Sequence, residues 1–201
     1  DIMFITKKSP FYAESGGQAG DIGTAILKNG NIKVSNVIKK AGDLHLVIGY
    51  LDGSMKCGDK INLCVDAVNR KQTTINHSAA HLMHEALRRT LGEHVTQKGQ
   101  MVDGNKIRFD ISHGKAISNE ELLAVEKEVN DIILQNSAST IETMKPDEAI
   151  AQGAMALFGE KYGDSVRVLS IGDNSGEEIG KYSVELCGGT HVEFTGDIAL
   201  F

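Results

Sequence analysis

The sequence predicts an α+β protein with two parts, a β-rich, barrel-like N-terminal module over residues 1–68 and an α+β module over residues 69–201. Up to about residue 66, short segments rich in Ile and Val are separated by Gly, Asn and Asp, a pattern typical of strands and turns. After residue 69 the apolar residues recur with the period of one helical face. This change of period places the module boundary near residue 68.

The N-terminal module is expected to consist of short strands. Their sequences are IMFIT, TAILK, NIKVSNVIKK, HLVIGYL and KINLCVDA. The segment KNGN at 28–31 predicts a hairpin turn, because Asn-Gly tolerates the positive φ that tight hairpins need. Several short strands at regular spacing indicate a small barrel or sandwich.

A long helix is expected to open the second module, from about Asn69 to Thr90, with Gly92 placed to end it. Its apolar face would be formed by Ile75, Ala79, Leu82, Met83, Ala86 and Leu87. The alternating segment KIRFDIS then predicts a strand.

The rest of the second module alternates between helix and strand signals. The segment SNEELLAVEKEVNDIILQN predicts a helix, because Ser118 followed by Glu121 forms a capping box. STIETMK predicts a strand, and PDEAIAQG a short helix with Pro146 in its first turn and Gly153 after its end. We expect SVRVLSIG, KYSVEL and THVEF to be the closing strands.

Composition limits the functional classes. The 201 residues carry a formal net charge of −6, which argues against non-specific binding to nucleic acid such as DNA, a property of clustered Lys and Arg. The 3 cysteines are widely spread and do not make a disulfide framework, so we expect a reducing, cytoplasmic setting. No apolar stretch is long enough to cross a membrane. Because the chain starts at Asp1, we expect a piece of a longer protein.

Four residues form a candidate metal site. His77 and His81 lie four residues apart in the expected helix and therefore share a face, and Cys187 and His191 bracket a Gly-Gly-Thr bend. Imidazole nitrogen and thiolate sulfur are the ligands of a tetrahedral Zn²⁺. The alternative is that the histidines form only a polar helix face. His84 shares that face and could replace one of the four ligands or support them from behind, but we interpret it as a bystander.

The spacing leaves the role of such a metal open. The helix carries Ser78, Ala79 and Ala80 between the two histidines, so the glutamate of the H-E-x-x-H metalloproteases is missing and peptide hydrolysis by that route is not expected. Hydrolysis of a more reactive ester asks less of a site. A structural zinc with four protein ligands is the competing interpretation.

The sequence resembles the editing region of the alanyl-tRNA synthetases. The segments that carry the resemblance are FYAESGGQAGDIG (11–23), NHSAAHLMHEALRRTLGEHVTQKGQMV (76–102), ALFGEKYGDSVRV (156–168) and ELCGGTHVEFTGDI (185–198). They span nearly the whole chain in the order of the family. The resemblance implies an α+β sandwich similar to the second additional domain of threonyl- and alanyl-tRNA synthetases. It also implies an excised editing domain, since the ATP-dependent ligase domain of the family is absent.

The resemblance further implies an activity, a cofactor and partners. The activity is hydrolysis of mischarged Ser-tRNA(Ala) and Gly-tRNA(Ala), at the acceptor end of tRNA(Ala), with the remainder of the synthetase chain as a partner. By family analogy Zn²⁺ is held by His77, His81, Cys187 and His191. The alternative from a different class is a non-catalytic tRNA-end binding module with a structural zinc. An unrelated metalloenzyme acting on small esters is a third possibility.

Further site residues follow from the same resemblance. Gln97 matches a glutamine that lines the editing pocket, and we expect it to orient water or substrate, because an amide cannot act as a base at neutral pH. Gly16 and Gly17 are expected to let backbone amides approach the acceptor end, with Gln18 as a nearby donor; a plain turn is the alternative. Ala80 stands where the family usually has threonine, so weaker selectivity for the seryl ester is expected. Ala199 replaces a usual glycine, and we attach no function to it.

Overall fold

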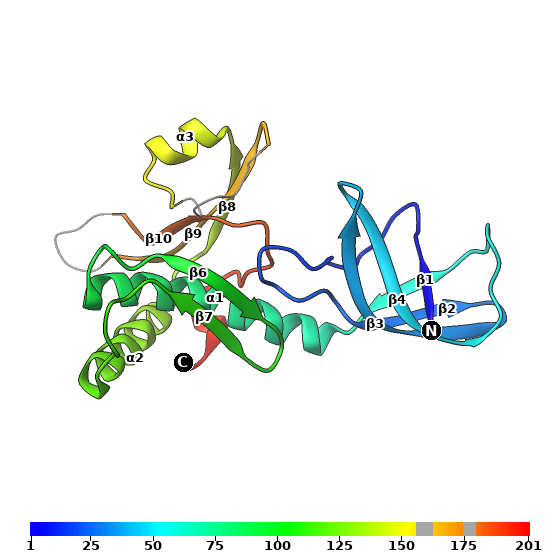
Figure 1. Cartoon of the computed structure of the whole chain (residues 1–201), viewed down its shortest axis with the longest axis horizontal. Helices are drawn as coiled ribbons and strands as arrows, with labels where there is room; N and C mark the ends of the chain where they lie inside the picture. Colours follow the sequence, from blue (N-terminus) through cyan, green and yellow to red (C-terminus); the bar gives the residue numbers. More distant parts are fainter. Residues whose placement is uncertain (156–162, 175–179) are drawn as a thin grey trace.

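The computed structural model describes residues 1–155, 163–174 and 180–201 (Figure 1). The stretch FGEKY at 158–162, part of a segment that carries the resemblance, lies outside the described residues. The architecture is mixed α+β with antiparallel sheets, as the sequence predicts. Among the described residues, no helix is long and apolar enough to cross a membrane.

The N-terminal module is an open antiparallel sheet of five strands in the order β1-β4-β3-β2-β5. The strands are β1 (Ile2–Phe4), β2 (Gly23–Leu27), β3 (Gly30–Lys40), β4 (Leu44–Gly53) and β5 (Asn62–Val65). The predicted hairpin at 28–31 is confirmed, since β2 pairs directly with β3. The barrel-like closure is not confirmed: β1 and β5 remain the two edges of the sheet. One face is buried around Phe11, Ile32 and Val47.

Helix α1 (Ala67–Leu91) follows the sheet and runs through the second module (Figure 1). It begins because the Asp66 side chain accepts hydrogen bonds from the backbone N–H groups of Val68 and Asn69, which have no partner inside the helix. It ends at Gly92, whose φ of 115° is readily adopted only by glycine. The predicted helix is therefore confirmed, two residues longer at its start.

The second module packs α1 and α2 (Asn119–Leu134) against small sheets. The predicted capping box of α2 is confirmed, because Ser118 Oγ accepts from Glu121 N–H and the Glu121 carboxylate accepts from Ser118 N–H. Strands β8 (Thr140–Met144), β9 (Val166–Asp173) and β10 (Lys181–Leu186) form a sheet in the order β10-β9-β8, with α3 (Pro146–Ala151) between β8 and β9. The core of this module includes Leu82, Val129 and Leu169.

One sequence prediction is extended here and one needs correction. The strand predicted from KIRFDIS is confirmed as β7 (Ile107–Ile111), which pairs in a hairpin with β6 (Gln97–Val102), a strand that the sequence did not predict. THVEF is not a strand: Phe194 makes only an isolated bridge to Ala138, and the chain continues into the 3₁₀ helix η1 (Thr195–Ile198). Instead of pairing with a strand, this segment contacts α1, where Val192 N–H donates to Ser78 Oγ at 3.0 Å.

One N-terminal segment leaves the first sheet and reaches the second module. Ala19 N–H donates to Val102 O at 2.9 Å, and Val102 N–H donates to Gly17 O at 2.8 Å. The glycine-rich segment therefore lies along β6, close to the helix that carries the histidine pair (Figure 1).

Candidate metal centre

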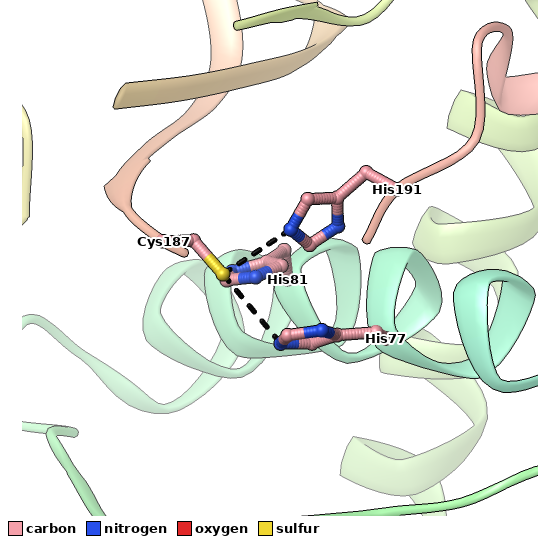
Figure 2. A group of neighbouring side chains, drawn as sticks. All are labelled: His77, His81, Cys187 and His191. Atoms are coloured by element: carbon pink, nitrogen blue, oxygen red, sulfur yellow. Dashed lines mark hydrogen bonds between the residues drawn. The ribbon is translucent and has the colours of Figure 1, made fainter. Parts of the chain in front are cut away.

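The four predicted ligands converge on one point (Figure 2). Their ligand atoms lie within 4.8 Å of one another. Cys187 Sγ lies 3.1 Å from His191 Nε2 and 3.6 Å from His77 Nε2. In a tetrahedral zinc site with bonds of ~2.0–2.3 Å, ligand atoms are separated by roughly 3.3–3.7 Å. The group is thus close to the separations that a bound zinc ion requires.

Local geometry explains how the chain brings the four residues together. His77 and His81 stand one helical turn apart on α1, and their rings stack with centroids 5.1 Å apart. Cys187 follows the last residue of β10, and the bend after it returns His191 to the same point. Arg167 fixes this bend, because its Nη1 donates to Gly188 O at 2.9 Å and to Gly189 O at 3.2 Å.

Gly189 is needed because of its small size. A Cβ atom there would lie 2.2 Å from His77 Cε1 and 2.4 Å from His77 Nδ1. Gly188 differs, since nothing lies within 4 Å of a Cβ placed on it. The bend can therefore approach α1 only through a residue without a side chain at position 189.

The buried side chains around the centre determine how His81 and His191 face it. His81 Nδ1 lies 3.0 Å from Glu185 Oε2, an acceptor, so this nitrogen carries the proton. Ser78 donates its hydroxyl proton to Thr74 O at 3.0 Å, so it accepts from His191 Nδ1 at 3.3 Å. In both rings Nε2 is then the nitrogen that can offer a lone pair to a metal ion.

An unpartnered atom indicates that the residues fit a metal ion. His81 Nε2 is buried and makes no hydrogen bond among the described residues, yet it belongs to the group that faces Cys187. A buried nitrogen lone pair without a partner is costly, and a metal ion at the centre would satisfy it. The donor set of three imidazole nitrogens and one thiolate is the one that zinc takes.

The electrostatic environment also favours a cation at this point. Burial opposes ionisation of Cys187, but the charge of His81 and hydrogen bonds from His191 and His77 lower the pKa of its thiol well below the usual value. Burial lowers the pKa of His81, but Glu185 and Cys187 outweigh it and raise this pKa to about 10 while no metal ion is bound; a metal ion at the centre would then replace the proton on Nε2. Two negatively charged groups therefore stabilise positive charge between them, which a divalent metal ion supplies.

A cavity of about 280 Å³ opens beside the metal ligands. Its lining includes His77, His81 and Cys187 together with Tyr12, Ser15, Gly16, Gln97, Gln100 and Arg167. The predicted pocket residue Gln97 is thus at the same cavity as the ligands, at the first position of β6. Gly16 lines the same cavity.

Three other candidates lie away from the cavity in the part of the chain that is described. Gly17 packs on β6, where a Cβ would lie 2.6 Å from Gln100 O. Gln18 is completely buried, with its amide hydrogen-bonded to His77 and Thr190. Ala80 is completely buried on α1 and is not among the lining residues.

The sequence did not reveal the residues that support the ligands. Glu185 accepts from His81 and also contacts His84 Nδ1 at 3.3 Å, so His84 is outside the ligand group but belongs to the same buried network. The alternation in KYSVEL would place Glu185 on the polar face of the strand with Lys181 and Ser183, so the pattern gave no sign that this carboxylate is buried two residues before Cys187. Nothing in the sequence pattern indicated Arg167.

Comparisons with known proteins agree with this picture. Residues 1–69 match the family model described as tRNA synthetases class II (A), and residues 166–201 match the Threonyl and Alanyl tRNA synthetase second additional domain. The chain is 55% identical over 200 residues to the alanine–tRNA ligase of Caulobacter vibrioides, which covers 100% of this chain and 23% of that protein. The alanine–tRNA ligase of Parvibaculum lavamentivorans is 53% identical over 203 residues, with the same coverage.

The chain belongs to the alanyl-tRNA synthetase family. It spans about a quarter of the length of these relatives. The match to the second additional domain includes Cys187 and His191, whereas His77 and His81 lie between the two matched segments. In this alanyl-tRNA synthetase segment, two of the candidate ligands thus come from the second additional domain and two from α1.

Proposed function

We propose that this segment edits mischarged tRNA by hydrolysing the ester of Ser-tRNA(Ala) and Gly-tRNA(Ala). The observation that supports the proposal best is the cavity beside the four metal ligands, with the Gln97 amide on its wall. Within the alanyl-tRNA synthetase family, a second hydrolytic site has a clear chemical purpose. A pocket for alanine cannot exclude the smaller glycine and rejects serine poorly, because one small group changes binding by only ~1–3 kcal/mol.

The residues of the cavity suggest how the work is divided. His77, His81, Cys187 and His191 would hold Zn²⁺, which would shape the wall of the cavity; it would act on the ester as a Lewis acid only if one ligand, such as Cys187, left the metal. Gln97 would orient the ester or the attacking water through hydrogen bonds, since an amide both donates and accepts. The space in front of Gly16 is open, since no atom lies within 4 Å of the place where a Cβ would be. The acceptor end could therefore approach the backbone of Gly16 closely.

A cationic side chain at the cavity would help to hold the tRNA end. Arg167 lines the cavity and is exposed, so it can face the phosphates of an acceptor strand while it holds the Gly188–Gly189 bend. With a net charge of −6, this segment would bind weakly by itself. The rest of the synthetase would carry the body of tRNA(Ala), in the cytoplasm where aminoacylation takes place.

A non-catalytic module that binds the tRNA end is the second candidate. The completeness of the ligand set favours it, because three histidines and one cysteine leave no open position for a metal-bound water. The two candidates differ in a measurable way, namely in whether the ester is hydrolysed.

The deciding experiment measures loss of the ester from Ser-tRNA(Ala), Gly-tRNA(Ala) and Ala-tRNA(Ala), with the chain alone and within the longer synthetase. The Gln97→Ala variant is compared with Gln152→Ala, a surface glutamine outside the cavity. If the segment edits, the seryl and glycyl esters are lost selectively. The rate of their hydrolysis by Gln97→Ala is then at least ~10-fold lower than by the unchanged protein, at unchanged zinc content. Hydrolysis at the buffer rate in both settings would leave only the binding function.

A further inference from the structure

Gln18 is the residue at which the N-terminal module contacts the candidate metal centre. Its side chain is completely buried, although the segment around it is glycine-rich and polar. Gly17 and Ala19 on either side are hydrogen-bonded to Val102 in β6, so the direction in which the Gln18 side chain leaves the backbone is fixed. It reaches the space between α1 and the bend that carries Cys187 and His191.

The amide of Gln18 is used entirely within the protein. Its Oε1 atom lies 2.8 Å from His77 Nδ1 and 2.9 Å from the backbone nitrogen of Thr190. Its Nε2 atom donates to Thr190 Oγ1 at 3.0 Å, and this oxygen is also within 2.8 Å of Thr74 Oγ1. A contact with substrate, which the sequence suggested for this side chain, would require breaking these bonds.

The hydrogen bonds determine the tautomer of His77. A backbone N–H can only donate, so the Gln18 atom that faces Thr190 N must be the carbonyl oxygen. The same oxygen faces His77 Nδ1, and two acceptors do not approach each other to 2.8 Å. His77 Nδ1 therefore carries the proton. Its Nε2 atom, which faces Cys187 Sγ, has the free lone pair that a metal ligand needs.

We infer that Gln18 is a positioning residue of the metal centre, which holds His77 in the Nδ1–H tautomer and ties the 187–191 bend to α1. Gly17 and Gly189 support this role, because only residues without a side chain let the backbone lie so close to its neighbours at these two positions. A Cβ at position 189 would lie 2.7 Å from Gln18 Oε1, and Gly17 has a φ of 82° while packing on Gln100. The Gly-Gly-Gln and Cys-Gly-Gly-Thr-His motifs, far apart in the sequence, thus serve one site. The inference depends on metal binding at this centre and is independent of ester hydrolysis.

Two substitutions at Gln18 separate positioning from simple packing. Gln18→Met keeps the length of the side chain and removes both hydrogen-bonding groups. Gln18→Glu keeps an acceptor for His77 Nδ1 and Thr190 N and removes only the donor to Thr190 Oγ1. If Gln18 positions His77, the glutamate variant retains the tautomer and the methionine variant loses it. If Gln18 only fills space, the apolar methionine is tolerated better than a buried charge.

The first readout is zinc affinity, measured by competition with a chromophoric chelator. Loss of a group that orients a metal ligand reduces affinity about 10–100-fold. We expect a loss in this range for Gln18→Met, a value within ~3-fold of the unchanged protein for Gln18→Glu, and no change for the surface control Gln152→Met. The second readout is ¹⁵N–¹H correlation of the histidine rings in zinc-loaded protein, in which the Nδ1–H signal of His77 persists in Gln18→Glu and is lost or exchange-broadened in Gln18→Met.

Two results of these measurements would contradict the role of Gln18. Unchanged zinc affinity in Gln18→Met, or a larger loss in Gln18→Glu than in Gln18→Met, overturns the inference. If Gln18→Met does not fold, Gln18→Ala replaces it: this variant also removes both hydrogen-bonding groups and adds no bulk, and unchanged zinc affinity there also contradicts the role. Failure of the unsubstituted protein to bind zinc would remove the metal centre itself. Deacylation is not measured, so absence of that activity would leave this result unaffected.

Discussion

Replacing Gly189 by alanine tests the construction of the metal centre most directly. The added Cβ would lie 2.2 Å from His77 Cε1, 2.4 Å from His77 Nδ1 and 2.7 Å from Gln18 Oε1. All three distances are below ordinary van der Waals contact, so either the bend or the His77 ring must move. Both carry parts of the ligand set, and neither can shift without spreading the ligand atoms.

The magnitude follows from the cost of overpacking. An extra carbon forced into a packed site costs about 1–3 kcal/mol. Metal binding requires both the bend and the His77 ring to keep their positions, so most of this cost is expressed in the metal-bound state. Because 1.4 kcal/mol corresponds to a tenfold change in an equilibrium constant, the zinc dissociation constant should rise roughly 5- to 150-fold.

The neighbouring glycine provides a matched control. Gly188→Ala adds the same carbon one residue earlier, where no atom lies within 4 Å of it. Both variants are titrated with zinc in the presence of a chelator, and their free energies of unfolding are compared in excess EDTA. We expect Gly189→Ala alone to lose zinc affinity. Equal affinities for Gly189→Ala and Gly188→Ala would refute the close approach of the bend to His77.

Three other predictions concern the surroundings of the site. Glu185→Gln removes a negative charge next to His81, so chelator competition should show zinc affinity about 10-fold or more lower; an unchanged value would mean that this charge does not support the centre. Ala80→Thr adds a methyl and a hydroxyl group at a completely buried position away from the cavity, so denaturant unfolding should show a loss of about 1–3 kcal/mol, whereas an unchanged free energy of unfolding would show that the packing there has room. Arg70→Met leaves the buried Asp21 carboxylate without its ion pair, and denaturant unfolding should show a loss of about 3–5 kcal/mol, whereas a loss below 1 kcal/mol would show that Asp21 finds other partners.

The sequence predicted those features that depend on local spacing. His77 and His81 were recognisable because an i, i+4 pair on a helix must share a face. Cys187 and His191 were recognisable because a bend between two ligands is a short-range pattern. The capping box of α2 was found in the same way, from Ser118 and Glu121.

Features that depend on distant contacts were missed or misjudged. Gln18 was interpreted as a donor to substrate, because nothing near it in the sequence shows that Thr190 and His77 occupy its hydrogen bonds. The strand prediction for THVEF failed because alternation is a local property of the sequence, whereas this segment is held to α1 by a long-range contact, the hydrogen bond from Val192 N–H to Ser78 Oγ. Barrel closure likewise depends on whether the two edge strands meet, which the composition of the strands does not determine.

The contact between Gln18 and Thr190 joins residues 172 positions apart. Closing so long a loop costs conformational entropy and delays contact formation, in contrast to zinc knuckles, whose ligands lie within one short segment. During synthesis, the helix with His77 leaves the ribosome long before Cys187 and His191 have been made. The complete ligand set therefore exists only after residue 191 has been made and the 187–191 bend has met α1, and in refolding experiments tight zinc capture would report that this long-range contact has formed.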